Sequence, residues 1–170
     1  DVLCPKSYYG MAKLMVESNL RFYHRISGLS YLILRPSNPY GPGQNTHGRQ
    51  GLIAVALGKA RDGQTLTVWG DGSQVRDYIY IDDLAKAVCA VMESGVQNET
   101  INIGSGEGLS VRDVIAHIND VCPQPLRVEY AKERQGDVAA SVLDVARMRQ
   151  FWHQPLTPIR SGIRTFWDSL

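Results

Sequence analysis

Apolar positions recur at two different spacings, which divide the chain into expected helices and expected strands. Spacing of three to four residues is typical of amphipathic helices, whereas short continuous apolar runs are typical of strands buried on both faces. The helical spacing covers 7–26, 51–61, 82–93, 110–121, a short stretch at 145–151, and the chain from 157 onward. The strand-like runs are 30–34, 66–69, 78–81, 100–103 and 127–130, with 140–143 extended or loop. This alternation of helices and strands predicts an α/β protein.

Capping residues support several of these boundaries. Ser7 is placed to cap the first helix and Gly28 to end it. Ser110 and Asp113 have the spacing of a capping box. We also expect Asp82 or Asp83 to cap the third long helix, and Thr157 to cap the last one with Pro158 as its first residue.

Two segments between these elements contain residues that favour turns. The stretch 35–43, RPSNPYGPG, holds three prolines and two glycines, so we expect a loop rather than a helix or a central strand. The stretch 104–108, GSGEG, follows a strand and precedes a helix, but Leu109 stands where a dinucleotide-binding G-x-G-x-x-G motif needs glycine. We therefore interpret it as a turn.

Composition narrows the class of protein. The 170 residues are 44% hydrophobic and 21% charged, with a net charge of +1, which is ordinary for a folded domain and gives no electrostatic reason to expect a nucleic-acid partner. No apolar run reaches the ~18 residues of a membrane span. The three cysteines form no C-x-x-C pair and cannot all be bridged within the chain, which favours reduced thiols and a cytoplasmic location. The chain starts at Asp1 without Met, so we expect a piece of a longer protein.

Tyr9 and Lys13 are the first candidate for chemistry. A spacing of four places both on one face of a helix, one turn apart. A cation there favours the phenolate electrostatically, which a tyrosine acting as general acid or base requires. Glu17 lies one further turn along, so an ordinary Lys13–Glu17 ion pair is the alternative.

The remaining candidates suggest an anionic ligand. Asn38 lies in the loop after an apolar strand, where ligands bind in open α/β sheets, although a structural turn would also use an asparagine. Arg76 and Arg134 each lie near a glycine turn and could hold a phosphate. Asp77 or Asp82 could instead neutralise Arg76. The histidines and cysteines show no metal-binding spacing, so we predict no metal site.

Five motifs follow one another in a family-specific order. They are 7–13 (SYYGMAK), 34–42 (LRPSNPYGP), 70–83 (GDGSQVRDYIYIDD), 102–104 (NIG) and 134–137 (RQGD). Together they resemble the extended short-chain dehydrogenase/reductase family, in particular nucleotide-sugar epimerases and dehydratases of the UDP-galactose 4-epimerase type. The resemblance covers essentially the whole chain but only the carboxyl-terminal half of the family.

The resemblance implies roles for individual residues. It implies that Tyr9 is the catalytic acid/base, that Lys13 holds the ribose of the nicotinamide, and that Pro36 lies beside this NAD cofactor. For the substrate, it implies that Asn38, Arg76 and Arg134 contact the diphosphate of a nucleotide-sugar. The remaining contacts that it implies are Val68, within the strand 67–69 along the nucleotide base, and Asp137 on the ribose or base.

The resemblance also implies an architecture and an activity. Residues 1–48 and 82–105 would form the end of a Rossmann-like doubly wound parallel sheet, and 49–81 with 106–170 a small α/β substrate-binding part. The glycine-rich NAD-binding half would precede this chain. The implied protein is a cytoplasmic, homodimeric, NAD-dependent epimerase acting on a UDP-sugar, with no nucleic-acid or membrane partner. A dehydratase or decarboxylase of the same family, or a non-catalytic binding module, remain the alternatives.

Overall fold

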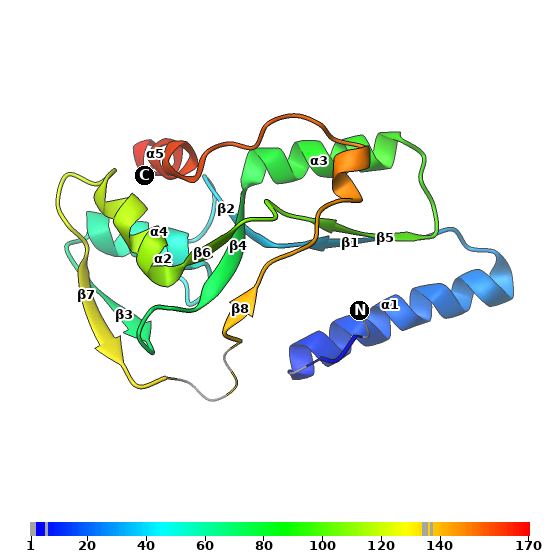
Figure 1. Ribbon diagram of the computed structural model, residues 1–170, viewed down its shortest axis with the longest axis horizontal. Helices are drawn as coiled ribbons and strands as arrows, with labels where there is room; N and C mark the ends of the chain where they lie inside the picture. The colour runs from blue at the N-terminus through cyan, green and yellow to red at the C-terminus, as the bar shows by residue number, and fades with distance from the viewer. Residues whose placement is uncertain (1–2, 6, 134–135, 137) are drawn as a thin grey trace.

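Helices and strands alternate along the chain in the computed structural model, which describes residues 3–5, 7–133, 136 and 138–170 (Figure 1). The helices are α1 (Tyr8–Ser27), α2 (Leu52–Arg61), α3 (Ile81–Glu93), α4 (Val111–Asn119), α5 (Ile159–Asp168) and the short 3₁₀ turn η1 (Met148–Gln150). The strands are β1 (Leu32–Pro36), β2 (Asn38–Tyr40), β3 (Thr65–Trp69), β4 (Val75–Tyr80), β5 (Glu99–Ile103), β6 (Gly108–Ser110), β7 (Arg127–Ala131) and β8 (Ala140–Ser141). The α/β class predicted from the periodicity is confirmed.

One part of the molecule is a pair of parallel strands with a helix on each face. β1 pairs with β5 so that Leu34 lies opposite Ile101, and Figure 1 shows α3 on one side of the pair and α1 on the other. Ile101 and Ile103 pack with Ala87 and Val91 of α3 in a buried cluster. Helices on both faces of parallel strands are the Rossmann-like, doubly wound arrangement.

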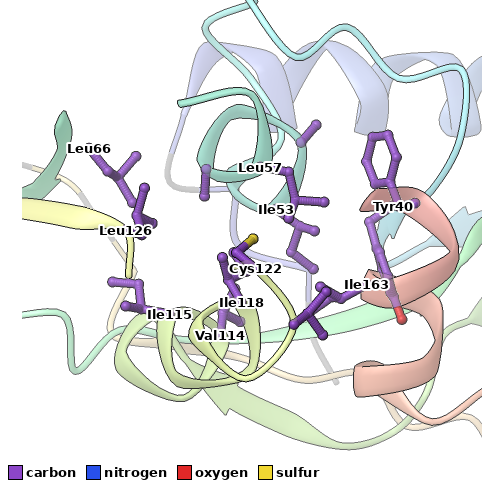
Figure 2. Close-up of a cluster of buried hydrophobic side chains, with 14 of the residues drawn as sticks. Tyr40, Ile53, Leu57, Leu66, Val114, Ile115, Ile118, Cys122, Leu126 and Ile163 are labelled. Atoms are coloured by element: carbon purple, nitrogen blue, oxygen red, sulfur yellow. The ribbon is translucent and has the colours of Figure 1, made fainter. Parts of the chain in front are cut away.

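The other part is built around β4 and a larger apolar core. β4 pairs in parallel with β2 and β8 and antiparallel with β6, while β3 pairs in parallel with β7. The core lies between α2, α4 and α5. Figure 2 shows Ile53 and Leu57 of α2 directed towards Ile118 and Cys122, with Ile163 of α5 beside them.

The expected caps of α1 and α4 are confirmed. The Ser7 hydroxyl accepts a hydrogen bond from the Gly10 backbone at 3.1 Å, and Gly28 ends the helix with a φ of 71°, in the left-handed region. Ser110 and Asp113 form the complete capping box. These signals are local, so the sequence alone is sufficient to place them.

Other boundaries differ from the sequence prediction. The expected loop 35–43 contributes the end of β1 and the whole of β2; Pro39 is tolerated because β2 is an edge strand, where a missing donor leaves no ladder bond unmade. α3 begins at Ile81, so Asp83 lies inside its first turn, where it is buried and accepts a hydrogen bond from the Thr157 backbone at 2.6 Å. Thr157 does not cap α5, because that helix begins at Ile159 and Pro158 holds the cap position.

Two further differences concern short elements. The helix expected at 145–151 is only the 3₁₀ turn η1, and the glycine turn at 104–108 leads into the short strand β6. Of the helices that the structure describes, none has the length and apolar character needed to cross a membrane.

Candidate functional site

A cleft beside β4 brings together three of the predicted substrate residues. It has a volume of about 290 Å³, and its wall includes Asn38 from β2, Val68 from β3 and Arg76 from β4. Side chains alternate along a strand, so Arg76 and Tyr78 both face the cleft while Asp77 between them points away. Parallel pairing of β2 with β4, which places Asn38 opposite Tyr78, is what joins these distant motifs.

Arg76 provides the positive charge of the cleft. Its Nη1 donates to the Val75 carbonyl oxygen at 2.8 Å, and it forms no ion pair with any residue that the structure describes. Asp77 is occupied elsewhere, accepting hydrogen bonds from Ser105 and Gly106. Among the described residues, neither Asp77 nor Asp82 neutralises the guanidinium, which remains available for an anionic ligand.

The start of α2 forms the opposite part of the wall, and the sequence reasoning missed it. Gly51, Leu52 and Ile53 line the cleft, and Gly51 caps the helix with a φ of 84° and no side-chain hydrogen bond. The first backbone N–H groups of a helix have no partner within it and favour negative charge. The sequence did contain a signal for this part of the wall: Gly51 stands immediately before an apolar helix and follows a polar loop.

Polar and aromatic side chains complete the cleft. Asn38 donates from Nδ2 to the Asp77 carbonyl oxygen at 2.7 Å, and Gln74 donates from Nε2 to the Trp69 carbonyl oxygen at 2.9 Å. Burial raises the pKa of Tyr78 to about 12, so its phenol stays neutral and can donate a hydrogen bond at any ordinary pH. Thr67 and Trp69 also line the cleft, which gives it a polar and aromatic side.

Tyr9 and Lys13 lie on a second surface, near the start of α1. The Lys13 Nζ is 5.3 Å from the centre of the Tyr9 ring, and Tyr9 is 73% exposed. Both line a shallow apolar hollow that also includes Arg35. Pro36 ends β1 opposite Ile103 and lines neither this hollow nor the cleft.

The alternative partner of Lys13 is occupied. Glu17 accepts two hydrogen bonds from Arg35, at 2.7 and 2.6 Å, and one from Arg21 at 3.1 Å. These bonds, those from Arg35 above all, hold the pKa of Glu17 below its ordinary value. Lys13 forms no ion pair with a described residue, and its three N–H groups, together with the phenolic O–H of Tyr9, are free to meet the hydroxyl groups of a ribose or a sugar.

Two of the predicted substrate residues are not among those that the structure describes. Arg134 and Asp137 are not among the described residues, so their predicted contacts with the substrate stay predictions. Within the ranges that the structure describes, no group of three or more histidine, cysteine, aspartate or glutamate side chains is placed to hold a metal ion.

Comparison with known proteins identifies the family of the chain. The sequence pattern of the NAD dependent epimerase/dehydratase family matches residues 2–104. A putative UDP-glucose 4-epimerase of Methanocaldococcus jannaschii is 34% identical over 160 residues, which is 94% of this chain and 52% of that protein. The chain thus spans about half the length of the curated relatives it matches.

Solved structures resemble the chain in fold as well. The UDP-glucose 4-epimerase of Thermus thermophilus, crystallised with NAD, matches with a TM-score of 0.90 and 32% identity over 98% of this chain and 54% of the other. The UDP-glucose 4-epimerase of Thermotoga maritima, crystallised with UDP-glucose, matches with a TM-score of 0.85 and 32% identity over 95% and 52%. These neighbours support the Rossmann-like fold.

Proposed function

The chain belongs to the NAD-dependent epimerase/dehydratase family, and on that premise we propose that the full-length protein epimerises a UDP-hexose at C4. The observation that carries the proposal is the cleft, where the start of α2 and the Arg76 guanidinium, which forms no ion pair with a described residue, line a space suited to a diphosphate. Relatives named as UDP-glucose 4-epimerases support the choice of nucleotide and sugar.

In this proposal the cleft binds the nucleotide. Arg76 and the first N–H groups of α2 bind the diphosphate, and Asn38 donates from the same side. The base lies along β3, against Val68 and its neighbours Thr67 and Trp69. Arg134 completes the diphosphate contacts, and Asp137 binds the ribose or the base.

In this proposal, a side chain of α1 transfers the proton. As the phenolate, Tyr9 accepts the proton of the C4 hydroxyl when C4 of the sugar is oxidised. As the phenol, it returns that proton when C4 is reduced. Lys13 binds the ribose of the nicotinamide, and Pro36 lies beside the ring. When bound, NAD would supply reversible hydride transfer, the chemistry that oxidation and re-reduction of the sugar need. The phenol and ammonium fit such a cofactor because both are exposed and lack ion pairs with described residues.

The test is product analysis with the full-length protein, UDP-galactose and NAD. We expect nuclear magnetic resonance to show UDP-glucose accumulating until the two epimers reach equilibrium. A product that has lost water would reassign the protein to a dehydratase. Release of carbon dioxide from UDP-glucuronate in a parallel reaction would reassign it to a decarboxylase. Binding of the UDP-sugar with no product at all would make it a binding module.

We further propose that the full-length protein is a cytoplasmic homodimer that uses the outer face of α1. Met15, Phe22 and Ile26 are about half exposed or more on this helix, forming an apolar stripe along it. Cys4 and Cys89 are exposed free thiols, which suits a reducing compartment. Light scattering should show a dimer that Met15→Glu dissociates; a wild-type monomer would contradict the assembly.

A further inference from the structure

Asp77 is a buried carboxylate whose hydrogen bonds hold three separate segments together. It lies in the middle of β4 and is 1% exposed. Its Oδ1 accepts from the Ser105 backbone at 2.8 Å and from the Ser105 hydroxyl at 2.7 Å. Its Oδ2 accepts from the Gly106 backbone at 3.0 Å and the Leu143 backbone at 3.3 Å. β4, the turn after β5 and the segment after β8 therefore meet at this one side chain.

The same residue lies directly behind the cleft wall. Its neighbours in β4, Arg76 and Tyr78, face the cleft, and its own carbonyl oxygen accepts the hydrogen bond from Asn38. The bond to Leu143 fixes the chain just after β8, where Ser141 lies opposite Arg76. β8 has only two paired residues, and both are exposed. The Asp77 side chain thus links the segment after β8 to β4 beside Arg76, and the Asp77 backbone links Asn38 to the same strand.

We propose that Asp77 is a positioning residue for the diphosphate site, an inference that rests on the proposed function of the cleft. Its carboxylate keeps β4 and the strand that returns beside it in register, so that Arg76 and Asn38 converge on one ligand. An asparagine of the same shape could not replace it. Asparagine has one acceptor oxygen and one NH₂ group, and that NH₂ would face backbone N–H donors.

The experiment is calorimetric titration of the full-length protein with uridine diphosphate, well below the unfolding temperature. We expect Asp77→Asn to weaken binding by at least ~10-fold, because a misplaced guanidinium loses charge-assisted bonds to phosphate. Asp113→Asn is the matched control: Asp113 also accepts bonds from a serine backbone and hydroxyl, at 2.8 and 2.6 Å, but it belongs to the capping box of α4 and not to β4. It should leave the affinity within about two-fold, whatever it does to stability.

A double-mutant cycle separates positioning from a general loss of stability. In an Arg76→Ala background, Asp77→Asn should weaken binding far less than it does in the wild type, because the group it positions is gone. Equal effects in the two backgrounds, or wild-type affinity in Asp77→Asn, would overturn the proposal. Wild-type protein that does not bind uridine diphosphate would instead refute the proposed function of the cleft.

Activity and a milder variant provide two further readouts. Asp77→Asn should raise KM for the UDP-sugar much more than it lowers kcat, since Tyr9 lies on α1, outside the three segments. If Asp77→Asn does not fold, Ser105→Ala removes a single bond to the carboxylate, and we expect it to weaken binding by about three-fold. Unchanged affinity in Ser105→Ala would then count against the positioning role.

Discussion

The region around the cleft and the region around α1 bury their apolar side chains to very different extents. In the cleft region, Leu57, Ile163 and Phe166 are fully buried among α2, α4 and α5. In the other region, α3 buries Ala87 and Val91 against the strand pair, yet no residue of α1 is buried. α1 is attached to the strands by polar bonds, chiefly those that Arg35 donates to Glu17, and its outer face is left apolar and exposed.

The difference shows how the proposed chemistry is divided. A closed core holds rigid walls around the cleft, which suits binding of the nucleotide. The exposed face of α1 instead carries Tyr9 and Lys13, which suits the proposed contact with a cofactor. Perturbing each region should therefore affect different measurements.

Loss of the Tyr9 hydroxyl should have the largest effect. In the full-length protein, Tyr9→Phe should lower kcat by ~10²–10⁴-fold, because it removes the group that transfers the proton. The affinity for uridine diphosphate should not change, since Tyr9 does not line the cleft. The adjacent, 91% exposed Tyr8 gives the matched control Tyr8→Phe. Near-normal turnover by Tyr9→Phe would refute the assignment.

Truncation of apolar side chains should distinguish the two regions by stability. Leu57→Ala should lower the free energy of unfolding by about 2–5 kcal/mol, because it leaves a cavity in a closed core. Met15→Ala, at a side chain that is 62% exposed, should cost less than about 0.5 kcal/mol in the 170-residue chain at low concentration. Urea unfolding measures both. A similar cost at the two positions would show that the outer face of α1 is covered in solution.

Removal of the cleft's positive charge should have an intermediate effect. Arg76→Ala should weaken binding of uridine diphosphate by at least ~10-fold, since charge-assisted bonds contribute about 1.5–3 kcal/mol each. Arg160→Ala, on the exposed side of α5, is the control and should leave the affinity unchanged. Calorimetry that finds the two variants alike would return Arg76 to a structural role.

Weakening the bonds that attach α1 should have the smallest effect, seen as a change in how the free energy of unfolding depends on pH. Hydrogen bonds from Arg35 lower the pKa of Glu17 in the folded chain below its ordinary value of 4.5. Its contribution to stability is therefore complete above that value and is lost as the pH falls through the lowered pKa. Between neutral and acid pH, the free energy of unfolding should fall less in Glu17→Gln than in the wild type. The exposed Glu93→Gln should behave like the wild type, and equal losses in all three would contradict the prediction.

Sequence periodicity and capping predicted most of the fold because these signals act over a few residues. Ser7, Gly28 and the pair Ser110–Asp113 hold the helix ends that their positions predict. The order of the motifs likewise predicted the family and the group of Asn38, Val68 and Arg76 that the cleft unites. The proposed roles of these three residues in binding the substrate are supported by their position in one cleft.

The remaining features depended on contacts between segments far apart in the chain. The sequence allowed Glu17 to pair with Lys13, but β1 brings Arg35 to it instead. Asp83 looked like a cap, but the segment before α5 provides the Thr157 N–H that it binds. The start of α2 became part of the cleft only when β2 and β4 paired beside it. Local spacing determined which elements form, whereas long-range hydrogen bonds and burial decided which side chains meet, because those free energies exist only once the strands have paired.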